Sequence, residues 1–199
     1  MSVSHGPHPS LTVLGIQGSP RQGNAEQMLQ AALAAAEEQG ARTELVRLAG
    51  LRIVPCTACR QCLEDGRCAL QDDMQALYPR LLAADVLLVA SPVFFCNVTA
   101  QTKAFIDRTW CLRGRLKDKV GGALVVGRRP GHEAALAALH AFFLKHEMIL
   151  GHRGALGFAF EGGELDQDPS ALAEARDLGR RVVELARWRP RPCLPEESP

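Results

Sequence analysis

The strongest constraint on the fold is a regular alternation between short apolar runs and longer segments with helical periodicity. The run Val86–Ala90 is apolar throughout, which is typical of a strand covered on both faces. Strands are predicted over residues 11–17, 43–48, 86–90, 122–126 and 155–160. Helices are predicted over residues 25–39, 72–83, 100–112, 133–145 and 168–188. Strands that alternate with helices indicate an α/β fold, in which helices cover both faces of a parallel sheet.

Local signals mark where two of the helices begin and end. Asn24 and Gln27 are expected to form a capping box at the start of the first helix, and Gly40 is expected to end it. The last helix is expected to begin with Asp168 as its cap and Pro169 in its first turn.

Length and composition favour one domain. The chain has 199 residues, and its net charge of +1 predicts no nucleic-acid partner and no basic membrane patch. No apolar run approaches the ~18 residues of a membrane-spanning helix, and the first residues lack the basic and apolar regions of a secretory signal. We therefore expect a cytoplasmic protein whose cysteines are thiols or metal ligands.

The domain is expected over residues 11–188, with a cysteine-rich insertion over 49–71 and flexible tails over 1–10 and 189–199.

Ligands of such sheets bind beyond the carboxyl ends of the strands, so the loop over residues 18–25 is the first candidate site. It leads into a helix N-terminus, where free amides and the helix dipole favour a phosphate. Ser19 and Asn24 can add neutral donors, and Arg21 can add a charge. The loop has neither a Walker motif nor GxGxxG, so a monophosphate on a flat cofactor fits better than a nucleoside triphosphate or NAD. An ordinary polar turn is the alternative.

The loop over residues 91–99 is the second candidate site. Phe94 and Phe95 stand where a solvated turn is expected, which suggests a platform for a planar ring. Alternatively, they pack under a helix or at a subunit interface. Cys96 is interpreted as filling space, with a thiol that tunes the bound ring as the alternative, and Cys111 is interpreted as a core residue.

The loop over residues 127–133 is the third, and it is glycine-bearing and basic. It could close over a ring or an anionic nucleotide, or it could be a solvated turn. Arg128 and Arg129 are candidates for holding the 2′-phosphate of NADPH. No side chain is assigned as a catalytic acid or base, and His132, the best placed histidine, is expected to be a satisfied surface residue.

Cys56, Cys59, Cys62 and Cys68 form a C-x2-C-x2-C-x5-C run. Bacterial ferredoxins hold iron–sulfur clusters with a similar run, whereas zinc sites more often pair two C-x2-C units across a longer loop. A cluster is therefore the first hypothesis, and free thiols or a zinc site are the alternatives.

Three segments resemble the NADPH-dependent FMN reductase family, and in particular its iron–sulfur flavoprotein branch. They are GSPRQGNAEQM, the cysteine run with the DDM that follows it, and ASPVFFCNVTAQTKAFIDR. The resemblance implies a flavodoxin-like, doubly wound, five-stranded sheet of order 2-1-3-4-5, with FMN at the switch point. It also implies that the four cysteines hold a [4Fe–4S] cluster, as in that branch.

The resemblance further implies which residues contact FMN. Around the phosphate they are Ser19, Arg21, Asn24, Ala25 and Glu26. Around the isoalloxazine ring they are Pro92, Val93, Phe94, Phe95, Asn97 and Gly127. The family usually has Thr or Ser where this chain has Ala25, so one hydroxyl donor worth about 1 kcal/mol is missing.

The sequence thus predicts an FMN-dependent NAD(P)H oxidoreductase that passes electrons through FMN and a [4Fe–4S] cluster. A flavin-binding redox sensor or scaffold with little turnover is the alternative, and a zinc-stabilised flavin protein is a third. Expected partners are small-molecule electron donors and acceptors, or a ferredoxin. Because FMN sites in this family often lie near subunit interfaces, a homodimer or homotetramer is also expected.

Overall fold

The central element of the computed structural model is a parallel sheet in the order β2-β1-β3-β4. Two short strands, β5 and β6, pair one after the other with the remaining edge of β4. The structure describes residues 10–159 and 161–189. The strands are β1 (Thr12–Gln17), β2 (Arg42–Arg47), β3 (Val86–Pro92), β4 (Val120–Gly127), β5 (Ile149–Leu150) and β6 (Ala155–Phe158).

The flavodoxin-like order 2-1-3-4-5 is confirmed, because the predicted fifth strand corresponds to β6. Strand β5 was not predicted, since two residues are too few to show a period. Strand β3 also runs further than predicted, through Ser91 and Pro92, which pair with Val125 and Val126. The second candidate loop is therefore anchored in the sheet up to Pro92.

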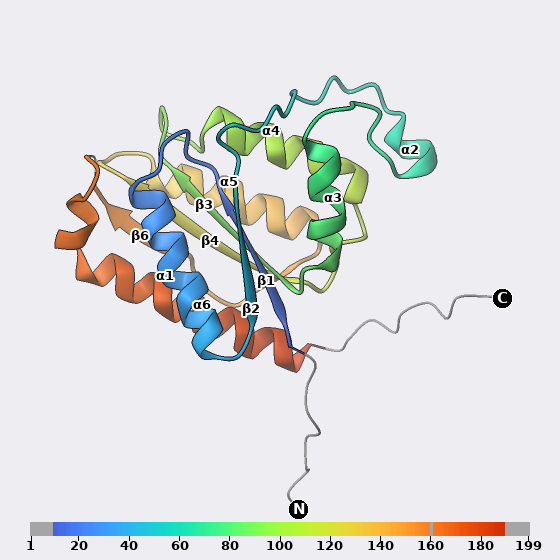
Figure 1. Ribbon diagram of the computed structural model, residues 1–199. Coiled ribbons are helices and arrows are strands. Elements are labelled where there is room, and N and C mark those ends of the chain that lie inside the picture. Colours follow the sequence, from blue (N-terminus) through green and yellow to red (C-terminus); the bar gives the residue numbers. More distant parts are fainter. Residues whose placement is uncertain (1–9, 160, 190–199) are drawn as a thin grey trace, which may run out of the picture.

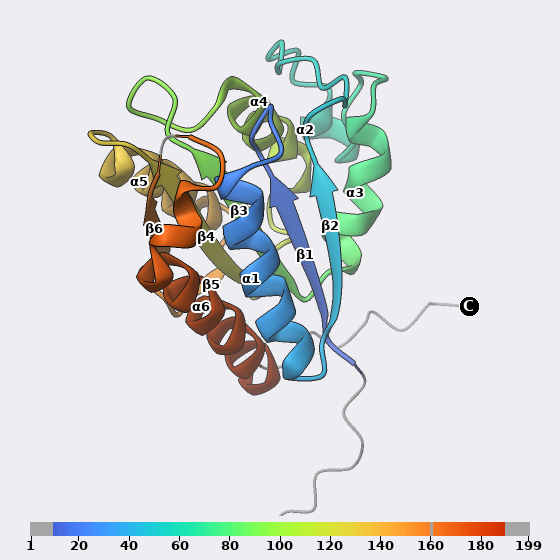
Figure 2. The same ribbon diagram turned by 60° about the vertical axis from the view of Figure 1, so that its left-hand side comes forward.

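Helices cover both faces of the sheet (Figures 1 and 2). Helices α1 (Asn24–Glu38) and α6 (Pro169–Trp188) pack together on one face. The other face carries α3 (Met74–Ala83), α4 (Ala100–Arg108) and α5 (His132–Lys145). Three short helices complete the described elements: α2 (Cys62–Asp65), η1 (Thr109–Leu112) and η2 (Glu164–Gln167).

Each face of the sheet has its own apolar core. Met28 and Val182 belong to the core under α1 and α6, and Phe105 and Phe143 belong to the core under α4 and α5. Strand β3 is buried from Val86 to Ser91, as its apolar run predicts, and β4 is buried along its whole length. Each fully buried large side chain contributes about 1.5–3 kcal/mol, so the two cores hold the strand ends firmly in place.

The helix ends agree only in part with their local signals. Asp168 caps α6 as predicted, since its carboxylate accepts from the amide of Ala171 at 3.1 Å. The capping box at α1 was wrong: Asn24 is already helical, and no side chain caps this end. Asn24 Nδ2 instead donates to the carbonyl of Glu161 at 2.8 Å, and Gln27 donates to Asp166. Both side chains of the predicted capping box therefore bind residues that are distant in the sequence and do not cap the helix.

The cysteine-rich segment over residues 49–71 leaves β2 and projects beyond the helices, with α2 near its tip (Figures 1 and 2). Apart from Ser10 and Arg189, the predicted tails lie outside the described residues. Arg189 forms an ion pair with Asp85. Within the described ranges, no helix has the length and apolar character needed to cross a membrane.

Candidate functional site

Three loops at the carboxyl ends of β1, β3 and β4 surround one cavity of about 380 Å³. Small-molecule sites typically measure about 300–1,000 Å³, so the cavity is large enough for a cofactor. The residues predicted to contact FMN that line it are Ser19, Arg21, Asn24, Ala25, Pro92, Val93, Phe94, Phe95 and Gly127. Glu26 and Asn97 do not line it.

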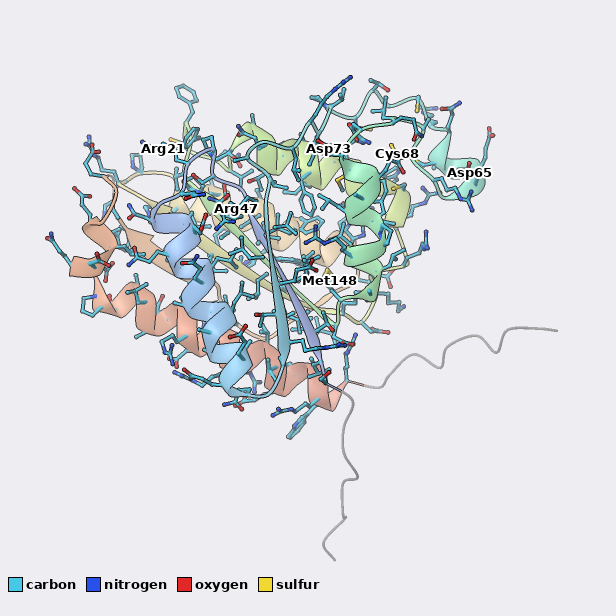
Figure 3. All side chains as sticks on the ribbon, in the orientation of Figure 1. Arg21, Arg47, Asp65, Cys68, Asp73 and Met148 are labelled. Atoms are coloured by element: carbon cyan, nitrogen blue, oxygen red, sulfur yellow. The ribbon has the colours of Figure 1, made fainter. Side chains whose placement is uncertain are left out.

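The first loop forms a polar end of this cavity. Ser19 is buried, and its Oγ accepts a hydrogen bond from the amide of Arg21 at 3.1 Å, which shapes the turn. Arg21 lies beside the start of α1 (Figure 3). The first-turn amides of α1 have no partner within the helix, and the helix dipole adds positive potential there. This end of the cavity suits a phosphate group.

The charge around the cavity has one sign. Arg21, Arg128 and Arg129 line it, and none of its described lining residues is an Asp or Glu. Arg129 also lies over the ring of Phe158, with 4.4 Å between the guanidinium carbon and the ring centroid. The cavity therefore favours an anionic ligand.

Asn24 provides an unused acceptor at the polar end. Its Nδ2 donates to Glu161, but its Oδ1 is buried and has no hydrogen-bond partner. A buried acceptor without a donor costs about 1–3 kcal/mol, so a ligand hydroxyl that donates to it would be favoured. A phosphorylated polyhydroxyl chain supplies such a group, and the residues at this end therefore fit FMN.

Glu26 is turned away from the cavity by an ion pair. Its carboxylate is buried and accepts from Arg47 Nε at 2.9 Å and from Arg47 Nη2. The resemblance implies that Glu26 lies at the phosphate, and its side chain is engaged by Arg47. The sequence gives no local signal for this pair, because Arg47 lies on β2 and meets Glu26 only in the folded sheet.

The second loop makes a tight turn between Phe94 and Asn97, whose main chains exchange two hydrogen bonds of 2.8 and 3.0 Å. Phe95 and Cys96, at the tip, both have positive φ, of 46° and 62°. Phe94 is 43% exposed and Phe95 is fully exposed, so none of the described helices covers them. Cys96 is exposed and lines the cavity, so its interpretation as a space-filling residue was wrong. Asn97 Oδ1 accepts from the amide of Val98 at 2.8 Å and supports the turn.

The third loop approaches the second so closely that it requires glycine. A β-carbon on Gly127 would lie 2.9 Å from Cβ of Val93, and one on Gly131 would lie 2.6 Å from Cα of Cys96. His132, where this loop passes into α5, is buried, with Nε2 2.9 Å from the carbonyl oxygen of Gly157. The expectation of a surface histidine was wrong, although its ring is satisfied as expected.

Buried hydroxyl groups beneath the cavity join the first two loops, and none of them was predicted from the sequence. Thr99 Oγ1 donates to the carbonyl of Gly18 at 2.6 Å, and its amide donates to Ser91 Oγ at 3.2 Å. Thr99 also caps α4 by accepting from the amide of Thr102. The cap position was the only signal in the sequence that could have indicated its role.

A second cavity, of about 290 Å³, brings together the four predicted ligands Cys56, Cys59, Cys62 and Cys68. Cys56 and Cys59 are exposed, whereas Cys62 and Cys68 are partly buried. In the described part of the chain, no three His, Cys, Asp or Glu side chains are arranged to hold a metal ion. The two cavities share no described lining residue, and Figure 3 shows Cys68 far from Arg21. Cys111 is buried, as predicted, and does not line this cavity.

The surroundings of Cys68 favour its thiolate. Burial by itself raises the pKa of this thiol, but the Leu70 amide, the Tyr78 hydroxyl and the Arg108 guanidinium outweigh burial and lower it. Thiolate is the form that ligates metals. The donor set of this cavity therefore fits a group held by cysteine sulfur.

The amino-acid sequence of this chain is similar to those of known proteins. The sequence profile of the NADPH-dependent FMN reductase family matches residues 11–161. An iron-sulfur flavoprotein from Methanocaldococcus jannaschii is 38% identical over 189 residues, covering 89% of this chain and 98% of that protein.

Solved structures show similarity in fold. A structure of RosB with bound 8-demethyl-8-formylriboflavin-5′-phosphate superimposes with a TM-score of 0.72 at 18% identity, covering 90% of this chain and 80% of that one. A WrbA-like flavodoxin from Agrobacterium tumefaciens gives a TM-score of 0.66 at 19% identity, covering 92% of this chain and 100% of that one.

Proposed function

Because the chain belongs to the NADPH-dependent FMN reductase family and is an FMN-dependent NAD(P)H oxidoreductase, we propose that FMN binds in the cavity between the three loops and that the four cysteines hold a [4Fe–4S] cluster. When bound, FMN supplies an acceptor for hydride from NADH or NADPH, and the cluster supplies one-electron transfer to a further acceptor. The chain's own residues bind and orient these groups.

The polar end of the cavity binds the phosphate. Ser19 and Arg21 donate to it, together with the amides of Ala25 and Glu26 at the start of α1. Asn24 Oδ1, which has no protein partner, accepts from a ribityl hydroxyl. This assignment uses the amide of Glu26, because its carboxylate is neutralised by Arg47.

The apolar end binds the isoalloxazine ring. Pro92, Val93 and Phe94 line one side, and Gly127 belongs to the loop opposite. Asn97 contributes by holding the turn that carries Phe94 and Phe95. The buried ring of His132 is already bonded to Gly157, so no histidine is assigned a proton-transfer role.

The observation that carries the flavin assignment is the division of one cavity into two unlike ends. The first loop supplies helix-start amides and Arg21, whereas the second loop supplies Pro92, Val93 and Phe94, with Arg128 and Arg129 of the third loop beside them. A flat ring joined to a phosphate by a hydroxylated chain matches this division.

The arrangement of the thiols favours a cluster over zinc. Zinc sites more often pair two C-x2-C units across a longer loop, whereas this chain has a C-x2-C-x2-C-x5-C run. The four cysteines surround a cavity, which suits a larger group. The iron-sulfur flavoprotein of Methanocaldococcus jannaschii supports this assignment by its name and its 38% identity.

Anaerobic purification followed by a visible spectrum and a metal count tests both assignments. We expect about one FMN, about four irons and acid-labile sulfide per chain, with bleaching of the flavin by NADH or NADPH. A colourless protein that FMN cannot reconstitute would refute the flavin site. Zinc in place of iron, or no iron after anaerobic reconstitution, would refute the cluster but not the flavin site.

A flavin-binding redox sensor without a cluster is the second candidate. The exposure of Cys56 and Cys59 favours it, since exposed thiols can also act as oxidation sensors. A bound flavin that NADH, NADPH and reduced ferredoxin all fail to reduce would support this candidate over the oxidoreductase.

Assembly into a homodimer or homotetramer remains a proposal. The fully exposed ring of Phe95 supports it, since large aromatic groups are enriched at protein interfaces. Sedimentation of the FMN-loaded protein measures the oligomeric state, and a monomer at micromolar concentration would contradict it.

A further inference from the structure

The cysteine segment is tied to the rest of the molecule through one buried ion pair. Arg108, the last residue of α4, is only 1% exposed although it carries a full charge. Its Nη1 donates to Asp72 Oδ2 at 2.5 Å, and its Nη2 donates to Asp72 Oδ1 at 3.0 Å. This two-point geometry is the strongest form of an arginine–carboxylate pair.

The same pair holds both ends of the segment that carries the four cysteines. Arg108 Nη1 also donates to the carbonyl of Val54 at 2.7 Å, and Nη2 donates to that of Leu70 at 3.3 Å. Asp72 Oδ2 accepts from the amide of Val54 at 2.8 Å. Val54 lies two residues before Cys56, and Leu70 lies two residues after Cys68. One guanidinium and one carboxylate therefore bind both ends of the segment, and Gln75 Nε2 adds hydrogen bonds to the carbonyls of Cys68 and Leu70 at 2.9 and 2.7 Å.

Between these two attachments the segment has little regular structure of its own. It contains only the short helix α2, and Ala58 and Arg60 adopt positive φ values of 53° and 65°. Only Cys62 and Cys68 of its described residues pack against a buried core, and both are themselves only partly buried. Attachment at the ends must therefore determine much of the segment's shape.

Arg108 has one further donor. Four of its N–H groups are used by Asp72, Val54 and Leu70, but Nε is buried and has no hydrogen-bond partner. A buried guanidinium N–H attracts a negative group, and an anionic cluster with its thiolate ligands is such a group.

We propose that Arg108 is a positioning residue for the cysteine ligands: with Asp72 it holds residues 54–70 in a ligand-ready shape before iron binds. The inference rests on the proposed cluster, but the attachment itself is a property of the metal-free chain. Residues that orient metal ligands typically change metal affinity by about 10- to 100-fold when they are replaced.

Hydrogen exchange on the metal-free protein tests the attachment directly. We expect the Val54 amide to exchange at least tenfold faster in Arg108→Lys, because lysine keeps the charge but cannot form the two-point bond. Peptides from β1, β3 and β4 should exchange as in the wild type. Arg113→Met is the matched control, since Arg113 is exposed beside Trp110 and makes no described bond to the segment.

Reconstitution with iron and sulfide tests the consequence. The iron-to-FMN ratio should fall at limiting iron in Arg108→Lys and remain unchanged in Arg113→Met. The double variant Arg108→Met/Asp72→Leu removes both buried charges together, so it should fold and bind FMN and still load iron poorly.

The proposal would be overturned if the Val54 amide of a folded Arg108 variant exchanged at the wild-type rate. It would also be overturned if that amide exchanged faster while the variant still took up iron as fully as the wild type. A wild-type chain that takes up no iron would instead refute the cluster itself. In that case the exchange measurement alone still decides whether Arg108 fixes the segment.

Discussion

The main chain of Gly18 lies directly against the hydroxyl of Thr102: a β-carbon on Gly18 would be 1.9 Å from Oγ1 of Thr102. The amide of Gly18 donates to the carbonyl of Ala90 at 2.8 Å, and its carbonyl accepts from Thr99. The first loop therefore rests on the end of β3 and the start of α4 without room for a side chain. This contact fixes the polar end of the cavity relative to its apolar end.

Replacing Gly18 with Ala should displace the first loop and weaken FMN binding at least tenfold, or about 1.4 kcal/mol. The affinity of the apoprotein for FMN can be measured by quenching of flavin fluorescence. The double variant Gly18→Ala/Thr102→Ala removes the closest atom and should recover part of the affinity. An unchanged dissociation constant in Gly18→Ala would contradict the described packing.

Replacing Arg47 with Met should weaken FMN binding more than riboflavin binding. Without Arg47 the buried carboxylate of Glu26 loses its counter-charge and repels a phosphate at the start of α1. We expect about a tenfold loss for FMN at low salt, and a smaller loss at high salt. The double variant Arg47→Met/Glu26→Gln should restore affinity. Equal losses for FMN and riboflavin would show that Arg47 acts only on stability.

The turn that carries Phe95 and Cys96 should store backbone strain. Both residues have positive φ, which Asn and Gly adopt at much lower cost. Phe95→Asn/Cys96→Gly should raise the free energy of unfolding by about 1–2 kcal/mol and should lower FMN affinity. Urea denaturation measures the first effect. The control Phe95→Leu/Cys96→Ser keeps both β-carbons and should show no such gain in stability.

Loss of one cysteine from the second cavity should remove iron without removing flavin. Cys56→Ser replaces a thiolate ligand with a poor one, so the iron-to-FMN ratio should fall to less than about half. Cys111→Ser is the comparison, because Cys111 does not line that cavity. Equal iron content in both variants would show that Cys56 is not a ligand.

The buried ring of His146 should make the fold sensitive to acid. Burial and the neighbouring charge of Lys145 lower the pKa of His146 below its ordinary value near 6.5. The folded state therefore binds fewer protons than the unfolded state, and the stabilisation from this group is complete above about pH 6.5. As the pH falls below that value, the free energy of unfolding should decrease by up to about 1.4 kcal/mol per unit until the folded pKa is passed. In His146→Gln the change in the free energy of unfolding with pH should be smaller by up to about 1.4 kcal/mol per pH unit, which corresponds to one proton. Urea denaturation between about pH 5 and 8 measures this change. His140 and His152 also have pKa values lowered by burial, so some slope should remain.

Local patterns predicted most of the architecture. The apolar runs of β1, β3 and β4, and the cap of α6 at Asp168, depend on residues within a few positions of one another. The same is true of the loop residues that line the cavity, since each loop simply follows its strand. The predicted capping box at Asn24 was wrong because a distant residue competes for its side chain. Asn24 Nδ2 donates to the carbonyl of Glu161, which is far away in the sequence.

By itself, the amino-acid sequence determined the order of strands and helices and the chemical groups available at each loop, because periodicity and turn residues act over short stretches of chain. The tertiary structure alone decided which of these groups pair with each other. Glu26 turns to Arg47, and Arg108 finds Asp72, because a charge that is removed from water must meet an opposite charge, and only strand order and helix packing place that partner within reach.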